Sequence, residues 1–288
     1  MQQPLWQLKK QMCEIGHRIW LKGFCAGNEG NHSIRISEDR AICTPTGISK
    51  GFLDPDDICV VDMDGNQVEP NPKGRKRTSE VLVHLAIYKH KPDVKAVIHS
   101  HPPHATAFAI SGVPLPEGIH PEAEVFLGRV PTAHYATPST DDLPNSIIPH
   151  IGPHTNTVLM GNHGSVSFSE IDLVDAFYKL EILDAYCRLL LLASQIGRPN
   201  QLSQDQMTEL LKVKQKFGLD DERLSCAPEG CVGEVNQPFF ARFDVNPMSA
   251  TCDGNGDVDK TVDTGGMDEA AFEQIVQTIT DQIMQSAK

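Results

Sequence analysis

The sequence lacks any long hydrophobic run. Its longest apolar stretch, Leu189 to Ala193, is far too short to span a bilayer. The first residues, Met1 to Pro4, show no charged segment followed by an apolar one, so no secretory signal is indicated. We therefore expect a protein without membrane spans that works in the reducing cytoplasm.

Positive charge is also scarce. The chain has 25 Lys and Arg against 38 Asp and Glu, a net charge of −13. Nucleic-acid binding needs a basic face, so this composition argues against it. The eight cysteines follow no regular spacing, and in a chain of 288 residues this predicts no disulfide framework. With 40% hydrophobic and 22% charged residues, the composition is that of an ordinary globular protein.

The hydrophobic periodicity predicts an α/β chain. Helices are expected over residues 5–22, 79–90, 105–110, 142–151, 170–196 and 203–216. Strands are expected over residues 33–36, 41–44, 58–63, 67–69, 94–101, 125–134, 157–160 and 166–168. Thr78 or Ser79 should cap the second helix, and Ser169 the longest one, because a hydroxyl accepts hydrogen bonds from the free amides of a first turn.

The composition changes after Leu224. Residues 225–266 are rich in Gly, Pro, Asp and Asn and have no sustained periodicity, which predicts a flexible linker. Residues 267–288 are again helical, with one apolar stripe formed by Phe272, Ile275, Val276, Ile279 and Ile283. We expect a main domain over 1–224, the linker, and an amphipathic helix that docks in a groove of a partner. The alternative is a helix folded back on its own oligomer.

Two histidines close the apolar run that ends at Ile98. His99 and His101 are two residues apart on a predicted strand, so their side chains share a face. Pro102 and Pro103 cannot continue the strand ladder, so the pair lies at a strand end. Two adjacent imidazoles at such a position predict half of a metal site.

The other half of the site has two candidates, His163 and Glu80. His163 follows an apolar strand in a loop flanked by glycines, which allow the backbone close to a ligand. Glu80 lies in the first turn of its helix. Three imidazoles and one carboxylate are typical of a catalytic zinc or similar divalent ion. The spacing alone leaves His104, His120 and His154 open as rival ligands.

Several motifs then occur together and in order over roughly residues 5–215. They are Gly30-Asn31-His32-Ser33, Thr44-Pro45-Thr46-Gly47, Thr78-Ser79-Glu80, His99-Ser100-His101-Pro102, His134-Tyr135-Ala136-Thr137 and Asn162-His163-Gly164. With these motifs the chain resembles the class II aldolase/adducin family, and within it the aldolases that cleave fuculose 1-phosphate. Asn28 and Asn162 depart from the residues most usual in that family, and the tail after residue 225 lies outside its common core.

The resemblance implies a three-layer α/β/α fold with a mostly antiparallel central sheet, usually as a homotetramer with sites between subunits. It implies that Glu80, His99, His101 and His163 bind Zn²⁺ or another divalent metal. It also implies a phosphate site formed by Asn28, Gly30, Asn31, Thr46, Gly47, Thr78 and Ser79. The glycine amides, hydroxyls and helix start in these segments agree with that assignment.

The implied reaction is cleavage of a deoxyhexulose 1-phosphate, such as fuculose or rhamnulose 1-phosphate, to dihydroxyacetone phosphate and lactaldehyde. Glu80 is the expected acid/base group and Tyr135, from a neighbouring subunit, the expected proton donor at the aldehyde oxygen. Open alternatives are a ribulose-5-phosphate 4-epimerase, whose relatives tend to carry Asp at the position of Glu80, a sugar-phosphate dehydratase, and an adducin-like structural protein. The C-terminal helix is similar to peptides that direct cargo enzymes into bacterial microcompartment shells.

Overall fold

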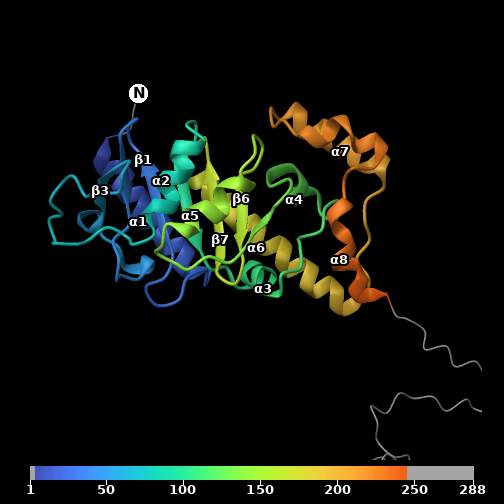
Figure 1. The fold of residues 1–288 in the computed structure, drawn as a ribbon, viewed down its shortest axis with the longest axis horizontal. Helices are drawn as coiled ribbons and strands as arrows, with labels where there is room; N and C mark the ends of the chain where they lie inside the picture. Colours follow the sequence, from blue (N-terminus) through green and yellow to red (C-terminus); the bar gives the residue numbers. More distant parts are fainter. Residues whose placement is uncertain (1–3, 245–288) are drawn as a thin grey trace, which may run out of the picture. The chain divides into compact units, whose positions relative to one another are not determined.

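The computed structural model describes residues 4–244, and a seven-stranded mixed sheet forms its centre (Figure 1). The strands lie in the order β3-β2-β1-β4-β7-β6-β5, and every neighbouring pair is antiparallel except the parallel pair β5 and β6. Their bounds are β1 Asn31–Arg35, β2 Arg40–Cys43, β3 Cys59–Asp62, β4 Ala96–Ser100, β5 Thr132–Ala133, β6 Thr157–Met160 and β7 Gly164–Ser169.

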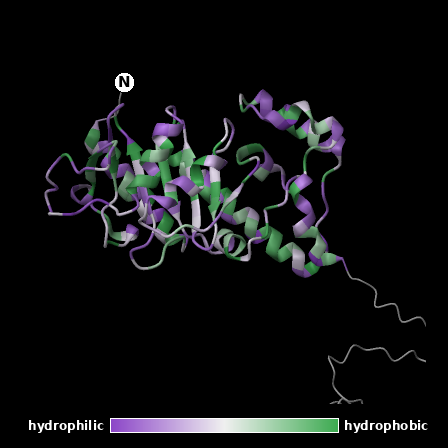
Figure 2. Ribbon diagram, in the orientation of Figure 1, coloured by the Kyte–Doolittle hydropathy of each residue, from purple (hydrophilic) through white to green (hydrophobic). Residues whose placement is uncertain are grey.

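Helices cover both faces of the sheet. Their bounds are α1 Leu5–Leu21, α2 Val81–His90, α3 Pro103–Ser111, α4 Pro121–Phe126, α5 Asp142–Ile147, α6 Leu173–Ile196, α7 Gln204–Lys216 and α8 Gln237–Phe240. Short 3-10 helices lie between them, among them Lys50–Phe52, Ile148–His150 and Glu222–Ser225. The central strands carry much of the hydrophobic sequence (Figure 2).

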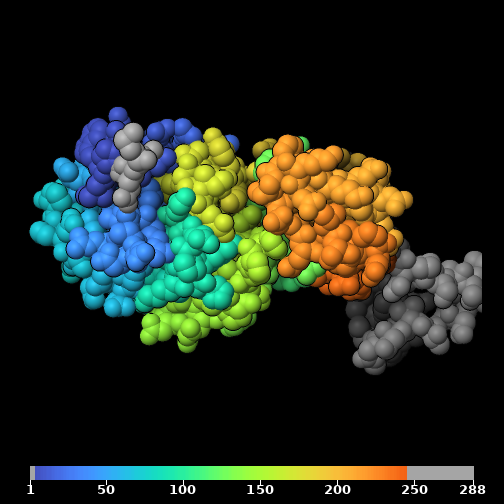
Figure 3. All heavy atoms as spheres, turned by 90° about the horizontal axis from the view of Figure 1, so that it is seen from above, coloured from blue at the N-terminus to red at the C-terminus, as the bar shows by residue number. Residues whose placement is uncertain are grey.

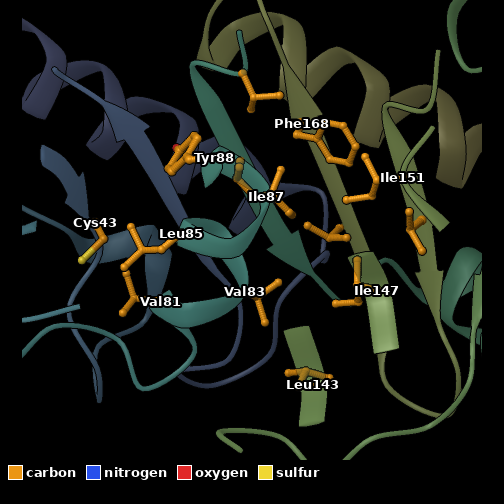
Figure 4. Packing of buried hydrophobic residues seen from close by; sticks show 14 of the residues in the cluster. Cys43, Val81, Val83, Leu85, Ile87, Tyr88, Leu143, Ile147, Ile151 and Phe168 are labelled. Carbon is orange, nitrogen blue, oxygen red and sulfur yellow. The ribbon is translucent and has the colours of Figure 1, made fainter. Parts of the chain in front are cut away.

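Alternation along the strands divides the core in two. On one face, Ile34, Ile42 and Ile98 pack against α1 and α6. On the other, Val61, Val97 and Val166 pack against α2 and α5, and Figure 4 shows side chains of this second cluster such as Leu85 and Ile147. Because successive side chains point to opposite faces, His99 shares the α2 face with Val97. The predicted three-layer α/β/α fold with a mostly antiparallel sheet is confirmed.

The predicted strand over 125–134 is wrong. Only Thr132–Ala133 is a strand, and Pro121–Phe126 is a helix that begins at a proline and ends before Gly128, which has φ 68°. The buried carboxylate of Glu124 accepts the Gly118 amide at 2.6 Å and pairs with Arg223 at 2.9 Å. These partners lie outside the local pattern, so periodicity could not reveal the helix.

Two predicted caps and one strand also differ. Asp172 caps α6 by accepting the Asp175 amide, and Ser169 accepts the amide of Ile171 instead. Helix α2 begins at Val81 after Glu80, with no side-chain cap, although the Thr78 hydroxyl accepts the Glu80 amide at 3.4 Å. The expected strand over 67–69 is reduced to a single bridge between Val61 and Gln67.

The predicted linker begins too early. Residues 4–244 form one compact unit, and within it Phe239 and Phe240 are buried against α3 and α6. Arg223 is buried in ion pairs with Asp221 and Glu124. Figure 3 shows the segment that ends at residue 244, in orange, as one continuous region of the surface. Widely spaced aromatic and charged anchors hold this segment, and such anchors leave no periodic signal. Residues 245–266 and the predicted helix 267–288 lie outside the described residues.

One disulfide also differs from the sequence expectation. Cys226 and Cys231 form a disulfide within a single turn-rich segment, where the chain folds back to bring their Cα atoms to 5.6 Å. The remaining cysteines of the described range, such as Cys25 and Cys187, are free thiols. Among residues 4–244, no helix combines the length and the apolar character needed to cross a bilayer.

Candidate metal centre

Three imidazoles meet at one end of β4. His99 lies near the end of that strand, His101 follows its last residue directly, and His163 comes from the turn between β6 and β7. Their ring centroids lie 4.7 to 5.0 Å apart, and one nitrogen of each ring lies within 4.8 Å of the others. The antiparallel pairing of β4 with β7 accounts for this meeting, because it places Ser100 opposite Ser165 and the turn beside the strand end.

Hydrogen bonds fix the tautomers of two of these rings. His99 Nδ1 lies 2.9 Å from the Ser165 carbonyl oxygen, and His101 Nδ1 lies 2.8 Å from a carboxylate oxygen of Glu29. Carbonyl and ionised carboxylate oxygens only accept, so both Nδ1 atoms carry the proton. The two Nε2 atoms, 3.1 Å apart, then face each other with lone pairs. Such an arrangement is favourable only when a cation lies between them.

Two of the three imidazoles, those of His99 and His163, are held neutral. Burial, and then the neighbouring His101 and His163, hold the pKa of His99 well below its ordinary value. Burial and His101 lower the pKa of His163 to about 4. Metal ligation requires unprotonated imidazole. The donor set therefore fits a divalent metal.

Glu80 lies beside this trio. Its two carboxylate oxygens are 3.5 Å from His99 Nε2 and 3.7 Å from His163 Nε2, and its side chain is 13% exposed. The Asn31 amide donates to it at 2.9 Å. Burial raises the pKa of Glu80, and the hydrogen bond from Asn31 opposes the rise. A carboxyl with a raised pKa is suited to proton transfer near neutral pH.

The glycines near His163 have a steric role. A Cβ at Gly164 would lie 2.5 Å from His101 Cδ2 and 2.7 Å from the Ser100 carbonyl oxygen. A Cβ at Gly161 would lie 2.8 Å from the Ala133 carbonyl oxygen and 3.1 Å from the Tyr135 backbone nitrogen. These glycines therefore permit close packing of the turn against the end of β4 and against the segment after β5. They also bring the segment of Tyr135 against the turn that carries His163.

Two of the predicted phosphate segments are joined by backbone hydrogen bonds. The Thr46 amide donates to Lys76 at 3.0 Å and the Thr78 amide to Thr44 at 3.0 Å. Thr46, Gly47 and Ser79 are exposed, whereas Thr78 is buried. This pairing holds the exposed hydroxyls of Thr46 and Ser79 on neighbouring segments ahead of helix α2.

The third phosphate segment is tied to the others by Lys50. This buried lysine donates to the carbonyl oxygens of Asn28 at 2.8 Å and Ile48 at 2.7 Å. Asn28 is exposed and Gly30 is buried against β4, with φ 71°. The Asn31 side chain instead faces Glu80 and His84. Tyr135 is 55% exposed, so its ring is open to a partner.

The rival histidines have other neighbours. His104 pairs with Asp184 at 2.8 Å, and His120 lies 3.3 Å from Glu122. His154 lines a separate cavity of about 210 Å³ together with Arg129 and His150. None of the three joins the cluster of ligand nitrogens within residues 4–244.

Sequence reasoning missed three residues around the centre. Glu29 contacts His101, His84 contacts Asn31, and Lys50 joins two loops. For His84 a signal existed, because it lies four residues after Glu80 and so on the same side of a helix. For Glu29 and Lys50 no spacing rule applies, since both act through irregular loops.

Comparison with known proteins agrees with this arrangement. The L-fuculose phosphate aldolase of Methanococcus maripaludis strain C5 is 30% identical over 184 residues, covering 64% of this chain and 96% of that protein. The 3-oxo-tetronate 4-phosphate decarboxylase of Haemophilus influenzae is 30% identical over 189 residues, covering 63% of this chain and 85% of that protein. A solved L-fuculose 1-phosphate aldolase matches with a TM-score of 0.66 and 29% identity, covering 74% of this chain and 96% of that one.

The family model described as Class II Aldolase and Adducin N-terminal domain matches residues 10–191, well over half of the chain. That range contains most of α1, the whole central sheet and all the residues of the metal centre. The predicted family and the predicted class of metal-dependent lyase are thereby confirmed: the chain belongs to the class II aldolase and adducin family.

Proposed function

We propose that this protein cleaves a deoxyhexulose 1-phosphate, such as fuculose or rhamnulose 1-phosphate, to dihydroxyacetone phosphate and lactaldehyde. The observation that carries the proposal is the meeting of three imidazoles with Glu80. The similarity to two L-fuculose phosphate aldolases supports the substrate class.

Cleavage breaks the C3–C4 bond of the ketose. Its electron pair passes to C3, which is then protonated, while the C4 hydroxyl loses its proton as the aldehyde carbonyl forms. His99, His101, His163 and Glu80 would hold a divalent ion, which when bound would supply Lewis-acid polarisation of the ketose carbonyl. Glu80, whose pKa is raised by burial, serves as the acid/base group at carbon.

The substrate phosphate is assigned to Asn28, Gly30, Asn31, Thr46, Gly47, Thr78 and Ser79. Three short segments carry these residues, and Lys50 and the 44–46 to 76–78 pairing join the segments. The start of α2 directly after Ser79 and Glu80 adds a favourable dipole for an anion. Asn31 supports this site by holding its segment in place, because both polar atoms of its side chain face Glu80 and His84 and its backbone pairs with His99 of β4.

A retro-aldol assay tests the reaction. Purified protein is incubated with fuculose, rhamnulose and ribulose 1-phosphates, and dihydroxyacetone phosphate is measured by a coupled reduction. Glu80→Gln should lower kcat at least about 100-fold, because it removes the acid/base group and keeps the shape. The control is Glu14→Gln, at an exposed residue of α1. A Glu80→Gln variant that keeps most of its kcat would rule out the role of Glu80.

The same experiment also tests a second class of reaction. One relative is named a 3-oxo-tetronate 4-phosphate decarboxylase, and loss of CO₂ next to a carbonyl leaves an electron pair at carbon just as aldol cleavage does. The panel therefore includes that substrate with CO₂ as the readout, and ribulose 5-phosphate with epimerisation as the readout. Turnover of either one in place of the 1-phosphates would overturn the aldolase assignment.

The metal is proposed to be zinc. Three imidazoles and one carboxylate are a frequent zinc donor set, although other divalent transition metals accept the same ligands. Elemental analysis of protein purified without chelators should give close to one zinc per chain, and a His99→Ala variant should lose it. Stoichiometric manganese, cobalt or iron in place of zinc would correct the identity and leave the site intact.

We propose a homotetramer in which Tyr135 faces the site of a neighbouring subunit. The support is the 55% exposure of its ring next to the turn that carries His163. Light scattering after gel filtration gives the oligomeric state. Tyr135→Phe should lower kcat mainly and leave the zinc content unchanged, since the hydroxyl is assigned to proton transfer only. A tetramer with unchanged kcat would remove Tyr135 from the mechanism.

We also propose a cytoplasmic enzyme that is recruited to a microcompartment shell through residues 267–288. The support is the apolar stripe of that segment and its lack of the basic residues typical of membrane-surface helices. A fluorescent protein fused to residues 267–288 should form foci when shell proteins are co-expressed. A variant with Ile275, Ile279 and Ile283 replaced by Ser is the control, and diffuse fluorescence of the unaltered fusion would refute the docking.

A further inference from the structure

The side chain of Glu29 links a loop to a candidate metal ligand. One carboxylate oxygen accepts the Ala26 amide at 2.6 Å, which closes the turn of its own loop. The other lies 2.8 Å from His101 Nδ1. One carboxylate is therefore shared between the 26–30 loop and the imidazole.

The partner of His101 differs in kind from the partners of the other two rings. His99 donates to a backbone carbonyl, whereas His163 Nδ1 is buried and has no hydrogen-bond partner in the part of the chain that the structure describes. Of the three rings, His101 is the one whose Nδ1 donates to a charged acceptor. A carboxylate behind a ligating imidazole fixes its orientation and raises its basicity, and removal of such a partner commonly weakens metal binding about 10- to 100-fold.

The loop that Glu29 belongs to has further anchors. Lys50 donates to the Asn28 carbonyl oxygen, and a Cβ at Gly30 would lie 3.2 Å from the His99 carbonyl oxygen. The same loop carries residues assigned to the substrate phosphate. Its position is therefore set on one side by Lys50 and on the other by the imidazole of His101.

We propose that Glu29 is a positioning residue that couples the metal site to the phosphate site. A metal bound at His101 Nε2 fixes that ring, the ring fixes the Glu29 carboxylate, and the carboxylate fixes the 26–30 loop that receives the phosphate. Coupling between two sites is reciprocal, so phosphate tightens metal binding by the same factor. This inference rests on the phosphate assignment of the proposed function.

The test measures two binding constants without using turnover. Zinc affinity is measured by competition with a chromophoric chelator, with and without inorganic phosphate. Phosphate affinity is measured by titration calorimetry on apo and zinc-loaded protein. The wild type should bind phosphate at least about fivefold more tightly when loaded with zinc, the lower end of common coupling factors.

Two variants distinguish a coupling role of Glu29 from a role only in closing the turn of its loop. Glu29→Gln has one acceptor oxygen, so it can serve the Ala26 amide or His101 but not both. It should bind zinc about 10- to 100-fold more weakly and lose the effect of zinc on phosphate affinity, with apo phosphate affinity within about twofold of wild type. Glu29→Ala should show the same zinc loss. Glu14→Gln is the charge-matched control and should match the wild type.

Three results would overturn the proposal. A wild type whose phosphate affinity does not respond to zinc shows that no coupling exists, whatever the variants do. Wild-type zinc affinity in Glu29→Gln, together with weakened zinc affinity in Glu29→Ala, makes Glu29 a turn residue only. If zinc still tightens phosphate binding in both variants, the coupling does not depend on Glu29. If the wild type binds no metal at all, the proposed function itself fails, which is a separate outcome.

Discussion

Lys50 should make this protein more stable at alkaline pH. Its side chain is 1% exposed, and its ammonium group donates to two backbone carbonyls, those of Asn28 and Ile48. Burial lowers the pKa of Lys50 to about 8, while Cys25, Glu29 and Glu80 oppose the decrease. The folded state therefore holds this charge less readily than the unfolded chain does.

The sign of the effect follows from proton binding. Below about pH 8 Lys50 is protonated in both states, and the folded state bears the full cost of the buried charge, on the order of 3 kcal/mol. Between about pH 8 and about 10.5 the unfolded chain binds more protons, so the free energy of unfolding rises with pH. From about pH 7 to about pH 10 the gain should be about 2 to 3 kcal/mol.

The assay is urea unfolding of metal-free protein at about pH 7, 8, 9 and 10, at one protein concentration. Lys50→Met removes the titrating group, so the stability of the wild type minus that of the variant should rise by about 2 to 3 kcal/mol across this range. Because both proteins contain the same thiols and phenols, the contribution of these groups to the pH dependence cancels in the difference between wild type and variant. Lys212→Met, at an exposed position of α7, should give a constant difference. A constant difference for Lys50→Met as well would refute the reasoning.

Three further predictions concern packing around the sheet. Leu180→Ala, at a fully buried position of α6, should lower the free energy of unfolding by about 2 to 5 kcal/mol in urea; a loss under about 1 kcal/mol would contradict this packing. Gly164→Ala should weaken zinc binding in chelator competition, because the new Cβ would clash with the His101 ring; unchanged affinity would contradict the crowding. Tyr88→Phe loses a buried 2.7 Å hydrogen bond to Ser33 and should lower the free energy of unfolding in urea by about 1 to 3 kcal/mol.

The individual helices and strands were predictable because their signals are local, whereas the three-layer arrangement came from the family resemblance. The long helix α6 and the strand β4 carry sustained apolar patterns, and both occur close to the predicted bounds. The meeting of His99 with His101 follows from strand alternation alone. His163 joins them through the pairing of β4 with β7, which neither the sequence pattern nor the family resemblance specified, although both named His163 as a candidate ligand.

What sequence reasoning missed depends on contacts between distant segments. Helix α4 places Glu124 next to Arg223, 99 residues later, and the C-terminal segment is held by that pair and by Phe239. A short apolar run such as Val125 to Leu127 fits a strand as well as it fits a helix end. Contacts with these remote partners decide between helix and strand, and such contacts cannot be seen in a short stretch of sequence.

A directed chain of hydrogen bonds lies beneath Glu80. The Asn31 amide nitrogen donates to the carboxylate, so the Asn31 oxygen must accept from His84 Nε2. Burial lowers the pKa of His84 to about 3, so this ring is neutral and its Nδ1 must accept from the Ser33 hydroxyl at 2.8 Å. The Ser33 oxygen is then left to accept from Tyr88.

Every donor in this chain points toward Glu80. All four supporting side chains are buried, so none can turn to water without leaving a partner unsatisfied. These hydrogen bonds thus favour the ionised carboxylate of Glu80, whereas burial favours the protonated form and raises the pKa of Glu80. The two effects act against each other on a single group. A carboxyl balanced in this way holds a proton more readily than an exposed glutamate does. It also offers a fixed oxygen to a metal. An acid/base group at this position requires both properties.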